Sequence, residues 1–167
     1  VEGMLIDVAD YSHVPGGPGI MLVAHEAHYG LDQGGGRPGM LYNRKRPWNG
    51  GDSGDGAPGL DRQLMAATKA ILRACVQLES EPELSGPASP CFDAGSLELT
   101  FFDRLLTPNN DLGRQGTEAP IAAFLDRLWG PGGWQLAAEG QDPRSPLRML
   151  ARAIERPAAC AELLAGL

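Results

Sequence analysis

The chain lacks a long hydrophobic run and closely spaced cysteines. Its longest apolar run, residues 20–24, is far shorter than the ~20 residues that a membrane-spanning helix needs. No cationic start precedes an apolar segment, as a signal peptide would require. The three cysteines form no C-x-x-C pair, which argues against a zinc knuckle or a redox dithiol. We therefore expect a soluble, cytoplasmic protein without a membrane segment.

Basic residues are scarce relative to acidic ones. Fourteen Lys and Arg against 21 Asp and Glu give a net charge of -7, and such a field repels phosphate backbones and anionic lipids. Nucleic acid and membranes are therefore not expected as partners, whereas a protein partner or a homo-oligomer remains open. Glycine and proline are abundant and indicate loops. Residues 49–59 hold five glycines and predict a flexible loop.

The hydrophobic pattern predicts five strands and three helices. Short apolar runs predict strands at residues 4–9, 20–24, 40–42, 96–106 and 134–138. Helical spacing predicts amphipathic helices at 60–78, from a Thr117 cap to a stop at Gly130, and at 145–154, with a short helix in the tail. The run 20–24 is apolar at every position, which suits a central strand covered on both faces.

These elements fit a single α+β domain over residues 1–167. We expect a mixed sheet of about five strands covered by two or three amphipathic helices, because each helix needs an apolar sheet face to pack against. The expected core consists of Leu5, Ile6, Val8, Leu22, Val23, Leu64, Ile71, Leu72, Leu99, Phe101, Phe124 and Leu128.

Polar side chains gather where the apolar runs end. Asp7 and Asp10 accompany the first run, and His25, Glu26 and His28 follow the second. If neighbouring strands run in the same direction, these groups meet at one edge, which is where open sheets bind ligands. Antiparallel neighbours would divide them between two edges. The sequence leaves both arrangements open.

The segment from His25 to His28 suggests metal chemistry, because imidazoles and carboxylates bind divalent ions. In this hypothesis a metal-dependent hydrolase or lyase binds a divalent metal through His25 and Asp10, and Glu26 is the base that activates a metal-bound water. Asp7, His13 and His28 are further candidate ligands. The spacing departs from H-E-x-x-H, and His25 and His28 project to opposite faces of a strand, so the site needs ligands from two strands. A hydrogen-bonded, partly buried His25 is the structural alternative.

The remaining motifs favour binding over catalysis. The glycine-rich residues 15–19 lack the G-K-[ST] end of a phosphate loop, and the chain has no G-x-S-x-G elbow. Arg44 to Trp48 form a basic patch beside an aromatic ring, which can hold a phosphate or an acidic partner. The first hypothesis is therefore a non-enzymatic binding or accessory module. Its partner would meet Arg44 and Trp48 or an uncovered sheet edge.

Several stretches resemble an uncharacterised family of small bacterial proteins. They are DVADY at residues 7–11, GPG at 17–19, HE at 25–26, LYNR at 41–44, and DRLL at 103–106 followed by PN at 108–109. The resemblance implies a helical segment ahead of Leu5 and a further strand after residues 142–144, where the periodicity here predicts a helix. It implies no activity, cofactor or partner.

Overall fold

The computed structural model describes residues 5–45, 59–87, 89–140, 142–155 and 159–167. The chain divides into two compact units. Unit 1 contains the described residues before Gly59 together with Ala66–Phe92, and unit 2 contains Gly59–Met65 and Asp93–Leu167. Among the helices of the described ranges, none has the length and apolar character needed to span a membrane.

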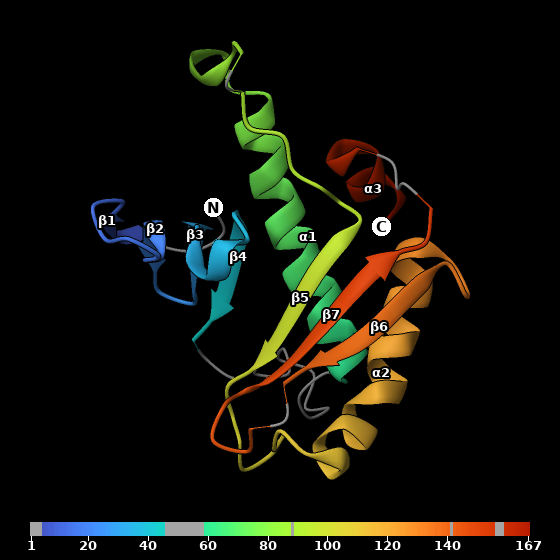
Figure 1. Ribbon diagram of the computed structural model, residues 1–167. Helices are drawn as coiled ribbons and strands as arrows, with labels where there is room; N and C mark the ends of the chain where they lie inside the picture. Colours follow the sequence, from blue (N-terminus) through green and yellow to red (C-terminus); the bar gives the residue numbers. More distant parts are fainter. Residues whose placement is uncertain (1–4, 46–58, 88, 141, 156–158) are drawn as a thin grey trace. The chain divides into compact units, whose positions relative to one another are not determined.

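Unit 1 contains a four-stranded antiparallel sheet in the order β1-β2-β3-β4 (Figure 1). The strands are β1 Leu5–Tyr11, β2 Gly19–Ala24, β3 Ala27–Asp32 and β4 Gly39–Arg44, and the short helix η1, Gly34–Gly36, joins β3 to β4. Each strand follows its neighbour in the chain, so short turns set the order. β1 consequently has a strand neighbour on one side only, within the part of the chain that the structure describes.

The core of unit 1 lies between α1, Leu60–Glu79, and one face of β2, β3 and β4. The rings of Tyr29 and Tyr42 meet edge to face with centroids 5.1 Å apart. On the helix side the cluster contains Ala70 and Ala74, and because alanine adds little bulk, the helix can pack closely against the sheet. The cluster consists of Ala27, Tyr29 and Ala70, with Leu22, Tyr42 and Ala74 packed against it. After α1 the chain forms the short helix η2, Pro82–Leu84.

Unit 2 contains a three-stranded antiparallel sheet in the order β5-β7-β6, and α2 lies along one face of it (Figure 1). Its elements are β5 Ser96–Phe101, α2 Asp111–Trp129, β6 Trp134–Glu139, β7 Leu147–Ala153 and α3 Cys160–Gly166. Alternate residues of β7 point into the core, as expected for a strand with one covered face. The core consists of Leu99, Ile121, Phe124, Leu125, Leu128, Leu147, Met149 and Ala151.

Helix α2 begins earlier than the sequence pattern predicts. Asn110 is its N-cap, with the side chain accepting a hydrogen bond from the Gly113 amide at 3.1 Å. Thr117, the expected cap, lies inside the helix, where its hydroxyl donates to the carbonyls of Gly113 and Arg114. A buried hydroxyl satisfied by its own helix explains why a residue typical of caps occurs there.

The α+β class is confirmed, but the single mixed sheet is wrong, because the strands form two separate antiparallel sheets. The helix predicted for residues 145–154 is also wrong. β7, Leu147–Ala153, occupies most of those residues and pairs with β5 and β6 on its two sides. Leu147 and Ala151 satisfy a period of about four as well as a period of two, so the pattern fits either element.

Three further expectations need correction. The expected core residues Leu5, Ile6 and Val8 are exposed, whereas Leu72, Leu99, Phe124 and Leu128 are buried as expected. β2 lies inside the sheet order, yet its Ile20 side chain is exposed, so the strand is not covered on both faces. β3 was not expected as a strand. The predicted loop at 49–59 lies outside the described residues except for Gly59.

Candidate functional site

The structure brings together three of the polar residues that the sequence singles out. His25 and Glu26 form the turn between β2 and β3, and Arg44 ends β4, where it pairs with Ala27. His25 Nδ1 lies 3.0 Å from Glu26 Oε1, and Arg44 Nη2 lies 3.5 Å from Glu26 Oε2. The Glu26 carboxylate is therefore shared between an imidazole and a guanidinium. The backbone carbonyl of Glu26 accepts a hydrogen bond from the Lys45 amide at 3.0 Å.

This cluster links the turn between β2 and β3 to the end of β4. All three side chains are partly exposed, and ion pairs between exposed groups contribute at most about 1 kcal/mol. A neutral His25 ring that donates through Nδ1 keeps Nε2 as an acceptor toward other groups. The basic patch predicted for this region is described only at Arg44 and Lys45, because Trp48 lies outside the described residues.

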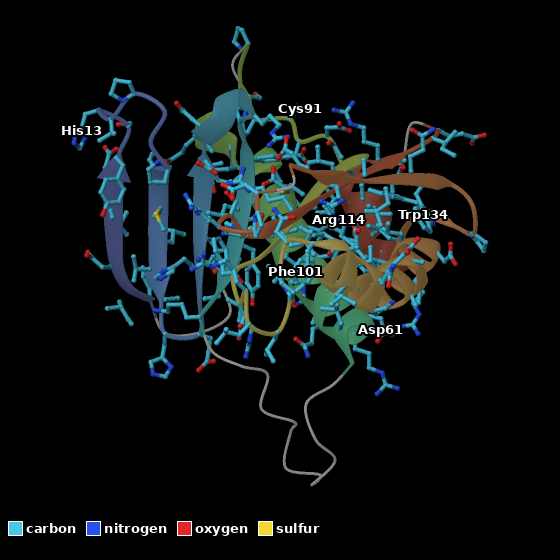
Figure 2. All side chains as sticks on the ribbon, turned by 60° about the horizontal axis from the view of Figure 1, so that its bottom comes forward. His13, Asp61, Cys91, Phe101, Arg114 and Trp134 are labelled. Atoms are coloured by element: carbon cyan, nitrogen blue, oxygen red, sulfur yellow. The ribbon has the colours of Figure 1, made fainter. Side chains whose placement is uncertain are left out.

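The other candidate ligands lie elsewhere in the sheet. Asp10 pairs with Ile20, and the β2 rows from Ile20 to Ala24, the residue before His25, span roughly 14 Å along the strand. His13 lies in the loop that follows β1, at the end of the sheet away from His25 (Figure 2). The strands are antiparallel, so the polar groups are divided between two ends of the sheet. This is the second of the two arrangements that the sequence left open.

Asp7 and His28 share one face of the sheet. Both pair with Val23, from opposite sides, so two strand spacings of roughly 5 Å each separate their backbones. No three His, Cys, Asp or Glu side chains among the described residues converge so that they could hold a metal ion. The metal-dependent hydrolase or lyase thus stays a prediction for which the described residues supply no geometric support.

His28 is partly buried, and its Nδ1 atom is buried without a hydrogen-bond partner among the described residues. Desolvation lowers the pKa of its imidazole below the ordinary value, and the nearby Lys45 ammonium lowers it further. The ring is therefore held in its neutral form within the sheet. This environment suits a structural histidine more than a proton donor.

The most unusual surface in unit 1 is the β1 edge, which we define as strand Leu5–Tyr11. Leu5, Ile6 and Val8 expose 52%, 57% and 54% of their surface. Leu5 and Val8 share the face on which α1 packs, because their β2 partners Ala24 and Leu22 lie two positions apart. The cluster on the helix side includes Leu22 but no residue of β1, so within the described part of the chain the apolar side chains of β1 stay exposed. Sequence reasoning missed this surface because it assigned these residues to the core.

A second apolar feature lies in unit 2, at the turn after β5. Leu105 and Leu106 expose 96% and 83% of their surface. Their amides both donate to Asp103 Oδ1, at 3.0 and 3.1 Å, and the Arg104 guanidinium donates to the Arg144 carbonyl. The amides of Leu105 and Leu106 are therefore hydrogen-bonded within the turn, and only their side chains are available to a partner. An edge strand, by contrast, presents apolar side chains together with unpaired backbone donors and acceptors.

Comparison with protein-family models, with curated proteins and with solved structures gave no match to this chain. The geometry of the described residues is accordingly the basis for any functional conclusion.

Proposed function

We propose that the protein is a non-enzymatic binding module that takes up an extended segment of a protein partner at the β1 edge. The observation that supports this proposal is the exposure of Leu5, Ile6 and Val8 on a strand that has one neighbouring strand among the described residues. An edge strand presents unpaired backbone donors and acceptors, and an added strand pairs them while covering the apolar side chains.

The expected binding is weak and reversible. Covering a fully exposed Leu, Ile or Val side chain contributes ~1.5–3 kcal/mol, so three half-exposed ones contribute ~2–4 kcal/mol. Each new backbone hydrogen bond adds ~0.5–1.5 kcal/mol net. The loss of rotational and translational freedom on association offsets much of this gain. We therefore expect dissociation constants in the micromolar range, as is common for strand addition to a pre-formed edge.

The proposal is tested by selecting extended peptides on the protein itself. A displayed library of random dodecapeptides is panned on the wild type, and the selected peptides are measured against Val8→Lys and Ile154→Lys. Val8→Lys places a charge on the edge strand, which is how natural edges block strand addition. Ile154 is a matched control, because it is an exposed apolar residue of unit 2.

We expect the selected peptides to bind the wild type and Ile154→Lys equally and Val8→Lys at least about tenfold more weakly. Equal melting temperatures of the two variants show that both are folded. Peptides that bind Val8→Lys as tightly as the wild type would contradict the proposal, and so would a library that yields no binder.

A further inference from the structure

The only formal charges on strand β1 are the side chains of Asp7 and Asp10, which are separated by the apolar residues Val8 and Ala9. Residues 5–24, which comprise β1, β2 and their loop, contain no lysine or arginine. The edge is therefore apolar and anionic, and no lysine or arginine lies beside its carboxylates in sequence. A partner of complementary charge would be cationic.

The Asp7 carboxylate occupies a backbone donor of this edge. The Val8 amide donates to Asp7 Oδ1 at 2.8 Å, which is the geometry expected of an amide on the free side of an edge strand. The register of β1 shifts between Leu5 and Asp7, so regular pairing with β2 begins at this carboxylate. An incoming strand that takes the Val8 amide must displace the carboxylate from it.

This displacement discriminates between partners. A neutral strand replaces the hydrogen bond to Asp7 but leaves the carboxylate without its donor. A strand that carries a Lys or Arg opposite Asp7 compensates the carboxylate with a charge-assisted hydrogen bond. Selectivity of this kind arises because the Lys or Arg strand gains a charge-assisted contact with Asp7 that the neutral strand lacks.

Asp10 adds a second carboxylate on the other face of the strand. Its Oδ1 accepts a hydrogen bond from the Ser12 amide at 2.9 Å. Hydrogen bonds from Ser12, and to a smaller extent the nearby His13, lower the pKa of Asp10 below its ordinary value. The side chain is therefore charged at neutral pH. Because Asp7 and Asp10 lie three positions apart in a strand, they project to opposite faces.

We propose that the segment bound at the β1 edge is cationic, with two Lys or Arg residues three positions apart and apolar residues between them. This inference rests on the proposed strand addition and names its partner by chemistry. The intervening residues face Val8 and Ala9, which are apolar. A second copy of β1 would offer carboxylates to carboxylates, so self-pairing at this edge is disfavoured.

The test uses three synthetic peptides that share one apolar scaffold and differ at two positions. Their central residues are Lys-Val-Val-Lys, Gln-Val-Val-Gln or Glu-Val-Val-Glu, and their affinities for the full chain are measured by fluorescence anisotropy. We expect the Lys peptide to bind about tenfold tighter than the Gln peptide, and the Glu peptide to bind most weakly. Raising the salt concentration from 0.05 to 0.5 M should reduce the preference for Lys.

Variants locate the effect. Asp7→Asn and Asp10→Asn should each reduce the Lys-over-Gln preference several-fold, whereas Glu118→Gln, an exposed charge change in α2, should leave it unchanged. Asp7→Ala also frees the Val8 amide, so the Gln peptide should bind this variant several-fold tighter than the wild type.

Two failures are distinguishable. Equal binding of the Lys and Gln peptides, abolished by Val8→Lys, would overturn the cationic preference and keep strand addition. Binding of the Lys peptide that is unaffected by both Val8→Lys and Asp7→Asn would overturn both, because the peptide would then bind outside the β1 edge.

Discussion

Two glycines of α2 offer a sharp test of the described packing, because they occur in one helix and differ only in their surroundings. A Cβ atom at Gly113 would overlap the carbonyl oxygen of Pro108 and lie 2.9 Å from its carbonyl carbon. That carbonyl also accepts the Asn110 amide at 2.8 Å, so it cannot retreat without disturbing the helix cap. A Cβ at Gly116 would meet nothing within 4 Å. Gly113→Ala should therefore destabilise the protein and Gly116→Ala should stabilise it.

The magnitudes follow from the contacts. Overpacking against backbone costs ~1–3 kcal/mol, and loss of the Asn110 cap costs ~1 kcal/mol. The higher helix propensity of alanine relative to glycine stabilises the folded state by ~0.5–1 kcal/mol at either site. We expect Gly113→Ala to lower the free energy of unfolding by ~1–3.5 kcal/mol and Gly116→Ala to raise it by ~0.5–1 kcal/mol. Urea denaturation followed by circular dichroism measures both. Changes of the same sign in the two variants would refute the packing described for this turn.

Other residues give independent checks. Phe124→Ala, at a fully buried core position, should cost ~3–5 kcal/mol, whereas Leu105→Ala, at a position 96% exposed, should change stability by less than ~0.5 kcal/mol; comparable losses in the two would place the core elsewhere. Leu72→Ala should cost ~2–5 kcal/mol, since Leu72 is buried, and an unchanged melting temperature would remove it from the core. The pKa of His28 is lowered in the folded state, so its contribution to stability is complete above the unfolded pKa of ~6.5 and is lost as pH falls through the folded value. Melting temperatures between pH 7.5 and 5 should fall more steeply for the wild type than for His28→Gln, and identical slopes would contradict the assignment.

The sequence predicts the long helix α1 well, because its apolar residues recur over five turns. It predicts β7 poorly, because ten residues fit two periods and the deciding factor is pairing with β5 and β6 on both sides. β3 is missed because Gly30 interrupts its apolar pattern. In the sheet, that glycine lies where a Cβ would approach the Ile20 carbonyl oxygen to 3.4 Å.

For the candidate site, the sequence indicates which residues are polar and near strand ends but not how the strands are arranged. The sequence identifies His25, Glu26 and Arg44 as polar groups near strand ends, and the structure places these three together. Whether Asp10 joins them depends on strand direction, which no local pattern encodes. The apolar residues of β1 are identical in character to core residues, and only the strand order shows that they form an edge. The acidic residues Asp7 and Asp10 among them are the sequence feature that distinguishes this strand from a buried core strand.

Amide hydrogen exchange at Val8, measured by NMR with and without the Lys-Val-Val-Lys peptide, reports directly on strand addition at the β1 edge. Strand addition at the β1 edge predicts that the Val8 amide exchanges at least about tenfold more slowly in the complex, because its donor passes from a side-chain carboxylate to a backbone ladder. The amides of β4, the opposite edge of the same sheet, should keep their rates. A complex in which Val8 exchange is unchanged, or in which the amides of β4 become protected instead, would show that the peptide does not add to β1.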